Sequence, residues 1–224
     1  RTYLGVDSDK NSVKNVVELA KEYSKSTGIV TNDSVTGATP AAFTVHLSAR
    51  DDETLIAQEQ IVNAKADIII GGGAAAYTEV VAETQSEGVT YEQYMSSNNI
   101  TWAKDWETAK SYKIAEGSRL IATLTDDYFK SYSDQPSLAE MTSTALTMLS
   151  ADEDGFFLMV EGGTMDKSAH EVDIVETSHQ IIEFDKAVVE AVRFAAENPD
   201  TLLIVTSDHD TGGCMLSSEA VAYI

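Results

Sequence analysis

The chain has 224 residues, 43% of them hydrophobic, which is enough for one sizeable core. No apolar run approaches the roughly eighteen residues of a membrane span, so we expect no membrane-spanning segment. The 37 acidic and 15 basic residues leave a formal charge of −22, spread along the whole chain. This charge argues against nucleic acid and anionic lipid as partners, because both need a positively charged surface. Its simplest interpretation is a solvated surface.

One cysteine, Cys214, cannot form a disulfide within the chain. The chain opens with Arg1 rather than Met, and no basic segment followed by an apolar one is present. We therefore expect that its start is missing or processed. No repeat, linker or low-complexity tract interrupts it, which predicts a single domain over residues 1–224.

Segments with helical spacing of apolar residues alternate with short β-rich runs. The predicted helices are Ser12–Lys25, Thr39–Arg50, Glu53–Ala66, Pro136–Leu149 and Ile174–Glu197. The predicted strands are Ile29–Val30 (closed by Asn32 and Asp33), Ala66–Ile70 (ending in the glycine turn Gly71–Gly73), Gly117–Leu124, Phe156–Val160 and Thr201–Thr206. Tyr91–Lys113 is less regular, and its Trp102 and Trp106 are expected to pack rather than bind a ligand. The alternation predicts an α/β fold with a mainly parallel sheet.

Acidic and imidazole side chains directly follow two of the predicted strands. Because the carboxyl ends of parallel strands meet at one edge of a sheet, we expect these groups to gather there. Oxygen and imidazole ligands without thiolates suit catalytic zinc, and a lone carboxylate suits magnesium. Two such metals can clamp the attacking and leaving oxygens of a phosphoryl displacement. The groups are Glu161, Asp166 and His170 after one strand, and Asp208 and His209 after the other.

Each pair has a simpler interpretation when taken alone. An isolated Asp-x-x-x-His or Asp-His is more often solvated or helix-capping than metal-binding, so only the combination points to metals. His46 and His179 lack such surroundings. We expect structural roles for both, His46 in an apolar helix and His179 in a long helix with a polar face.

At the acidic and imidazole groups that follow the two strands, the sequence resembles the alkaline phosphatases, most closely their bacterial forms. Nearly the whole chain is covered, and the motifs are specific in combination. The similar segments are Gly155–His170, Thr201–Gly213, Ser26–Val30, Ala38–Ala42 with Arg50, Ala66–Gly73 and Pro136–Leu149. The resemblance implies a three-layer α/β/α sandwich.

The resemblance also implies roles for individual residues. Asp166 and His170 would bind one zinc, Asp208 and His209 a second zinc, and Glu161 and Thr39 a magnesium ion. Arg50 would hold two phosphate oxygens with its planar fork, and Lys167 would tune the charge near the phosphate or the magnesium. Without the resemblance, we would interpret Arg50 as the partner of Asp51 or Asp52 in a surface ion pair. Thr39 would then be a helix N-cap ahead of Pro40.

The sequence departs from the family at several points. Gly37 stands where many members place an aspartate or histidine near the magnesium, so we expect fewer groups around that ion. The serine nucleophile is expected before this sequence begins, and an aspartate shared by the second zinc and the magnesium further upstream. A third histidine of the first zinc is expected beyond Ile224. We therefore expect an internal fragment with impaired metal binding and little turnover.

In the complete protein the resemblance implies hydrolysis of phosphate monoesters through a phosphoserine intermediate, with two Zn²⁺ and one Mg²⁺. Little substrate specificity is expected beyond the phosphoryl group. Two alternatives stay open: a related two-metal phosphodiesterase or sulfatase, and a metal- or phosphate-binding module without catalysis. By family analogy we expect a homodimer in the periplasm, at the cell surface or outside the cell.

Overall fold

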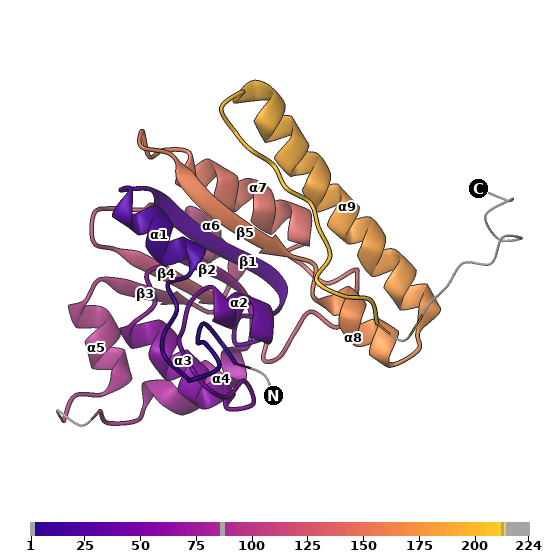
Figure 1. The fold of residues 1–224 in the computed structure, drawn as a ribbon. Helices are drawn as coiled ribbons and strands as arrows, with labels where there is room; N and C mark the ends of the chain where they lie inside the picture. The colour runs from indigo at the N-terminus through magenta and orange to yellow at the C-terminus, as the bar shows by residue number, and fades with distance from the viewer. Residues whose placement is uncertain (1–2, 86–87, 212, 214–224) are drawn as a thin grey trace, which may run out of the picture.

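A five-stranded sheet forms the centre of the computed structural model, which describes residues 3–85, 88–211 and 213 (Figure 1). All four strand pairings are parallel, in the order β3-β4-β2-β1-β5. This confirms the predicted α/β fold with a parallel sheet. The strands are β1 (Ser26–Ser34), β2 (Ile68–Gly72), β3 (Ile100–Ala103), β4 (Arg119–Thr123) and β5 (Phe156–Glu161).

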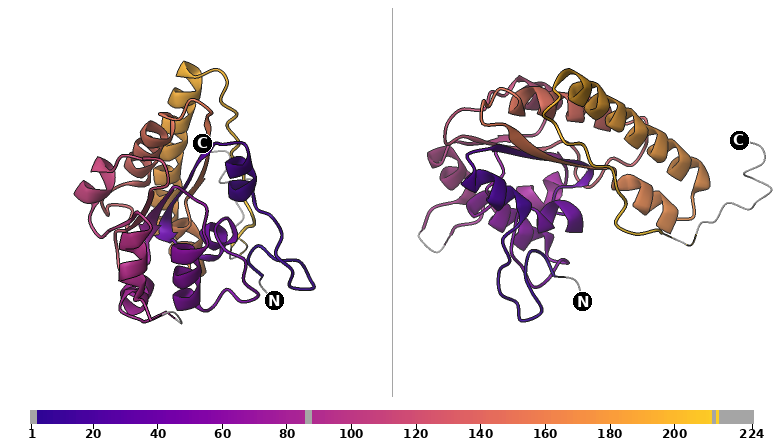
Figure 2. Two further views of the ribbon diagram at one scale, coloured as in Figure 1. Left: turned by 90° about the vertical axis from the view of Figure 1, so that its left-hand side faces the viewer. Right: turned by 45° about the horizontal axis from the view of Figure 1, so that its top comes forward.

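Helices cover both faces of the sheet (Figure 2). In the described part of the chain, no helix is long and apolar enough to cross a membrane. The helices are α1 (Val16–Glu22), α2 (Ala38–Ala42), α3 (Glu53–Val62), α4 (Ala74–Val81), α5 (Tyr91–Ser97), α6 (Trp106–Ser111), α7 (Leu138–Leu149), α8 (Thr164–His170) and α9 (Ile174–Glu197).

Two cores lie on opposite faces of the sheet because successive strand residues point to opposite sides. Ile29, Ile69 and Ile121 belong to the core covered by α1, α3, α4 and α5. Val30 and Ile70, each next to one of these residues in the chain, belong to the core covered by α6, α7 and α9. The strands are therefore buried on both sides, which gives the three layers that the family resemblance implies.

The helices α7 and α9 follow the sequence pattern closely. Ser137 caps α7 by accepting from the Glu140 backbone N–H, while the Glu140 side chain accepts from the Ser137 backbone N–H. Such a reciprocal capping box satisfies two backbone donors at a helix start. Asp173 caps α9 in the same position, and α9 ends at Glu197 as its periodicity predicts.

Several predicted boundaries were wrong in the N-terminal half. The helix expected from Ser12 begins only after Asn15, whose side chain caps α1. The helix expected over Thr39–Arg50 ends at Ala42, because the chain beyond it pairs elsewhere: Leu47 forms an antiparallel bridge with Leu4. The short strand expected at Ile29 extends over nine residues as β1, with a register irregularity after Val30.

Several short elements escaped prediction, and one predicted strand does not form. The elements α4, α5, β3 and α6 have too little periodicity of their own to be recognised. The predicted strand Thr201–Thr206 is irregular, and Leu202 and Ile204 are 83% and 71% exposed. Figure 1 shows this segment returning from the end of α9 toward α8. An apolar β-branched run forms a strand only when a neighbour pairs with it, and within the described residues none does.

Candidate metal and phosphate site

The site forms where β1 and β5 end at the carboxyl edge of the sheet. The two strands are paired in parallel, which places Thr31 of β1 opposite Glu161, the last residue of β5. The Thr31 hydroxyl donates to Glu161 Oε2 at 2.6 Å. The predicted magnesium ligand Glu161 is therefore half-buried and held in place by a neighbouring strand.

A buried polar network attaches α8 to the same edge. The Thr164 backbone N–H donates to Asn32 Oδ1 at 3.2 Å, and the Thr164 hydroxyl donates to Gln180 Oε1 at 2.7 Å. Asn32 Nδ2 donates to the same Gln180 oxygen at 3.3 Å. Because buried amides need partners, this network fixes the start of α8 against β1 and α9. The side chains of Asp166 and Lys167 are thereby placed at the strand ends.

The side chains of both predicted zinc pairs are open to water. On α8, Asp166 Oδ2 and His170 Nε2 are 3.6 Å apart, so both side chains share one side of the helix. Asp208 Oδ2 and His209 Nε2 are 3.2 Å apart in an exposed segment. The Thr211 hydroxyl bonds to Asp166 and connects this segment to α8. Within the described residues, no three His, Cys, Asp or Glu side chains converge as a metal cluster.

The electrostatics of the site centre on Glu161. Burial raises its pKa from 4.5 to about 7, against the hydrogen bond from Thr31, which lowers it. The negative charge of Asp33 raises the Glu161 pKa further, the Thr39 hydroxyl bond lowers it, and Asp208 raises it. The structure thus brings Thr39 and Glu161, the two expected magnesium ligands, together with two further carboxylates.

Sequence reasoning missed Asp33 in this site. Its side chain is largely buried, its Oδ1 accepts from the Ser34 N–H at 2.7 Å, and its Oδ2 lies 3.3 Å from Lys167 Nζ. Burial raises the Asp33 pKa, while the positive charge of Lys167 opposes that rise. The sequence marked Asn32 and Asp33 as the end of a short strand. The available signal was a polar run at the end of a strand, next to another strand that also ends in an acid.

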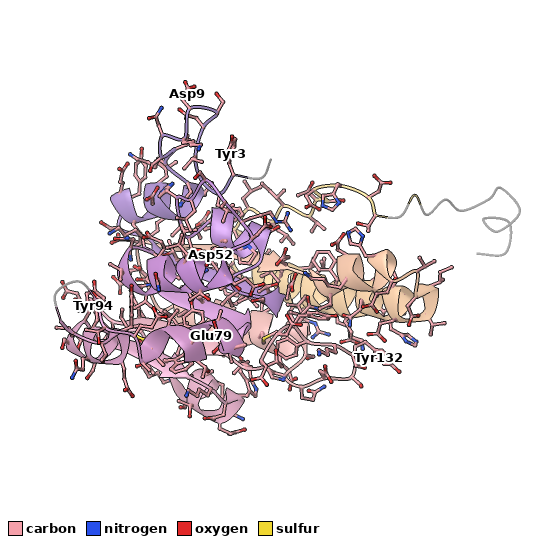
Figure 3. All side chains as sticks on the ribbon, turned by 90° about the horizontal axis from the view of Figure 1, so that it is seen from below. Tyr3, Asp9, Asp52, Glu79, Tyr94 and Tyr132 are labelled. Carbon is pink, nitrogen blue, oxygen red and sulfur yellow. The ribbon has the colours of Figure 1, made fainter. Side chains whose placement is uncertain are left out.

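The structure also settles the simpler interpretations of Arg50 and Thr39. Arg50 is exposed between α2 and α3, and its guanidinium forms no ion pair within the described residues. Asp52 instead caps α3 by accepting from the Leu55 backbone N–H at 2.9 Å, and Figure 3 labels it. Gly37 is the N-cap of α2, so Thr39 lies inside the helix and is not its cap.

Both remaining histidines make structural contacts, although His46 does not lie in the predicted helix. His46 Nδ1 is 2.5 Å from the Gly5 carbonyl oxygen, and its Nε2 is 2.9 Å from Glu18 Oε1. His179 lies on α9 and packs against Tyr132, with 4.1 Å between ring centroids. Tyr132 is labelled in Figure 3. These contacts connect chain segments and do not involve the strand-end groups.

The donor types at this edge fit the expected metals to different degrees. The carboxylate of Glu161 and the hydroxyl of Thr39, beside Asp33, form an all-oxygen set of the kind magnesium prefers. The pair Asp166 and His170 offers the oxygen and nitrogen donors that zinc accepts. Catalytic zinc takes three protein ligands, however, and each zinc pair described here supplies two. The magnesium group is therefore the better formed of the two kinds of site.

This combination defines an α/β protein with carboxylate, hydroxyl and imidazole side chains near the carboxyl edge of a parallel sheet. The chain belongs to the alkaline phosphatase family, whose family model matches residues 1–224.

Individual relatives agree with this assignment. Alkaline phosphatase 3 of Bacillus subtilis is 32% identical over 97% of this chain and 47% of its own length. Alkaline phosphatase 4 of the same organism is 34% identical over 94% of this chain and 45% of its own length. A variant of the TAB5 alkaline phosphatase, solved with Mg bound in its M3 site, has a TM-score of 0.81 and 30% identity, covering 95% of this chain and 60% of its own. The chain thus spans about half the length of the curated relatives it matches.

Proposed function

We propose that the complete protein is a metal-dependent hydrolase of phosphate monoesters that works with two Zn²⁺ and one Mg²⁺. The observation that carries this proposal is the meeting of Glu161, Thr39 and the α8 residues at the carboxyl edge of the sheet, in a chain of the alkaline phosphatase family. Magnesium bound in the related TAB5 variant supports the metal requirement. Phosphate monoesters would be the substrates and inorganic phosphate a product.

The chain's own residues would bind and orient the phosphoryl group. The exposed guanidinium of Arg50 forms no ion pair with the described residues, and it would donate two hydrogen bonds to phosphate oxygens in a bidentate contact. Lys167, held by Asp33, would place a positive charge beside them. Bound divalent metals would supply Lewis-acid activation of a nucleophile and stabilisation of a leaving oxygen. The phosphoserine intermediate would form on a serine that the described site does not contain.

We further propose that this 224-residue chain turns over little substrate when alone. Asp208 and His209 have side chains that are 72% and 58% exposed, and they hold no metal-binding geometry with a third ligand among the described residues. A site this open is poorly preorganised for catalysis. The homodimer and a periplasmic, cell-surface or extracellular location remain proposals from family analogy.

Hydrolysis assays of the longer protein that contains this chain test the proposal. We expect turnover of p-nitrophenyl phosphate that chelation removes and Zn²⁺ with Mg²⁺ restores, and much slower turnover of the matching diester and sulfate. Arg50→Ala should lower kcat/KM by at least about tenfold, since it removes a bidentate charged contact. Arg193→Ala is the matched control, because Arg193 pairs with Glu190 on the exposed side of α9.

Three results would contradict this function. Faster hydrolysis of the diester or the sulfate would favour the related two-metal enzymes. Metal and phosphate binding without turnover in the longer protein would favour a binding module. Equal losses for Arg50→Ala and Arg193→Ala would remove Arg50 from the phosphate site.

A further inference from the structure

Two glycines lie beside the side chain of Asp33, and one of them makes room for it. A Cβ on Gly37 would lie 3.6 Å from Asp33 Oδ2, and it would also come within 2.9 Å of the Ser34 carbonyl oxygen. A Cβ on Gly163 would lie 2.7 Å from Asp33 Cβ and 3.2 Å from its Oδ2. Asp33 therefore needs the space that Gly163 leaves, whereas a Cβ on Gly37 would make an ordinary contact with its carboxylate.

The same volume is bordered by Glu161. A Cβ on Gly163 would lie 3.2 Å from Glu161 Cδ, the same distance as from Asp33 Oδ2. The Thr31 hydroxyl connects the two acids, because it accepts from the Asp33 backbone N–H at 2.9 Å and donates to Glu161 Oε2. Carboxylates from β1 and β5 thus approach one small space from two sides.

The charges in this space do not balance within the described chain. Asp33 is 8% exposed, and two carboxylates so placed repel each other. Among the described residues, the ammonium group within ion-pair distance of either acid is that of Lys167, whose side chain is 39% exposed. A divalent cation would neutralise both carboxylates, and oxygen donors are those that magnesium prefers.

We propose that Asp33 supplies, from β1, the carboxylate beside the magnesium site that the glycine at position 37 cannot supply. Asp33 then helps Glu161 and Thr39 to hold one divalent cation. Lys167 stays beside Asp33 and limits the negative charge of the site. This inference rests on the proposed function. The carboxylate would have moved from the start of α2 to the end of β1, with Gly163 leaving the space it needs.

Calorimetric titration of the 224-residue chain with Mg²⁺ alone tests this role without any activity measurement. Asp33→Asn keeps the shape of the side chain and removes its charge. We expect a 10- to 100-fold weaker affinity for Mg²⁺, the usual loss when a supporting group of a metal site is removed. Asp127→Asn is the matched control. Asp127 affects Asp33 and Lys167 through charge alone, and it should change the affinity by less than about threefold at ~0.15 M salt.

A double variant separates binding of the cation from simple pairing with Lys167. If Asp33 only neutralises Lys167, then Asp33→Asn/Lys167→Gln should recover the original affinity, because no unpaired ammonium remains. We expect the double variant to stay at least tenfold weaker than the original chain, and it also carries the test if the single variant does not fold. Thermal unfolding without metal identifies variants that have lost the fold.

The outcomes distinguish this inference from the proposed function. Recovery in the double variant, or equal affinities for Asp33→Asn and Asp127→Asn, overturns the role of Asp33 and leaves the proposed function intact. Absence of saturable Mg²⁺ binding by the unaltered chain overturns the magnesium site in this chain and the role of Asp33 with it. Turnover of the longer protein, measured separately, decides the proposed function.

Discussion

Replacing Glu161 by glutamine should stabilise the metal-free chain and abolish its response to magnesium. Burial and the charge of Asp33 raise the pKa of Glu161 from 4.5 to about 7, so the ionised carboxylate is held in an unfavourable place. At 1.36 kcal/mol per pKa unit this amounts to about 3 kcal/mol, and water around the half-buried side chain reduces it to about 1–3 kcal/mol. Glutamine keeps an oxygen that can accept from Thr31.

The sign of the pH dependence follows from the two pKa values. Between pH 4.5 and about 7 the folded chain retains a proton that the unfolded chain has lost, so this group's contribution to stability falls as the pH rises. Above pH 7 both states are ionised and the loss is complete. Glu161→Gln removes this dependence. The variant should match the original chain at pH 4.5 and exceed its free energy of unfolding by about 1–3 kcal/mol at pH 8.

Urea unfolding in the presence of a chelator measures this difference at both pH values. Magnesium at one hundred times its dissociation constant should then raise the free energy of unfolding of the original chain by about 2.7 kcal/mol, and that of the variant by much less. A variant that is no more stable than the original at pH 8 would show that Glu161 is not an energetically unfavourable carboxylate. An equal gain from magnesium in both chains would remove Glu161 from the metal site.

Two further predictions concern stability away from this site. Burial lowers the pKa of His46, but its contacts with Gly5 and Glu18 outweigh burial and raise that pKa above 6.5. The stabilisation that protonated His46 provides is therefore complete below pH 6.5 and is lost as the pH rises through its folded-state pKa. In urea unfolding, His46→Gln should lower the free energy of unfolding by about 1–2 kcal/mol at pH 6 and by less at pH 9. Equal losses at the two pH values would contradict the charged contact. Leu149→Ala should cost about 2–5 kcal/mol by the same assay, because Leu149 is fully buried, whereas the exposed Leu202→Ala should stay within about 0.5 kcal/mol.

The sequence predicted best where local signals and burial agree. The bounds of α9 and the end of α7 follow from apolar periodicity, and Ser137 and Asp173 mark the helix starts by capping. The strand expected to bring Asp208 and His209 to the same edge does not form among the described residues, whereas the apolar run Phe156–Val160 correctly predicted that Glu161 lies at the carboxyl end of β5. Such features depend on neighbouring residues in the chain, so the sequence carries them directly.

Asp33 shows what local signals miss. Its residue type and its neighbour Asn32 are typical of a turn, and the sequence alone ended the strand there. In the structure β1 continues to Ser34 because its polar residues find partners on α8, α9 and β5. Those partners lie some 130 positions away in the chain, beyond the reach of any local pattern.

The sequence by itself determined the main alternation of strands and helices, the acid Glu161 at the end of β5, and the family. Only the tertiary structure decided that Asp33 lies beside Glu161, that Gly163 leaves room for it, and that Thr201–Thr206 stays unpaired among the residues described. The physical reason is the same in each case. Pairing of strands and burial of charge depend on which distant groups come to lie alongside, whereas periodicity and capping depend on residues a few positions away.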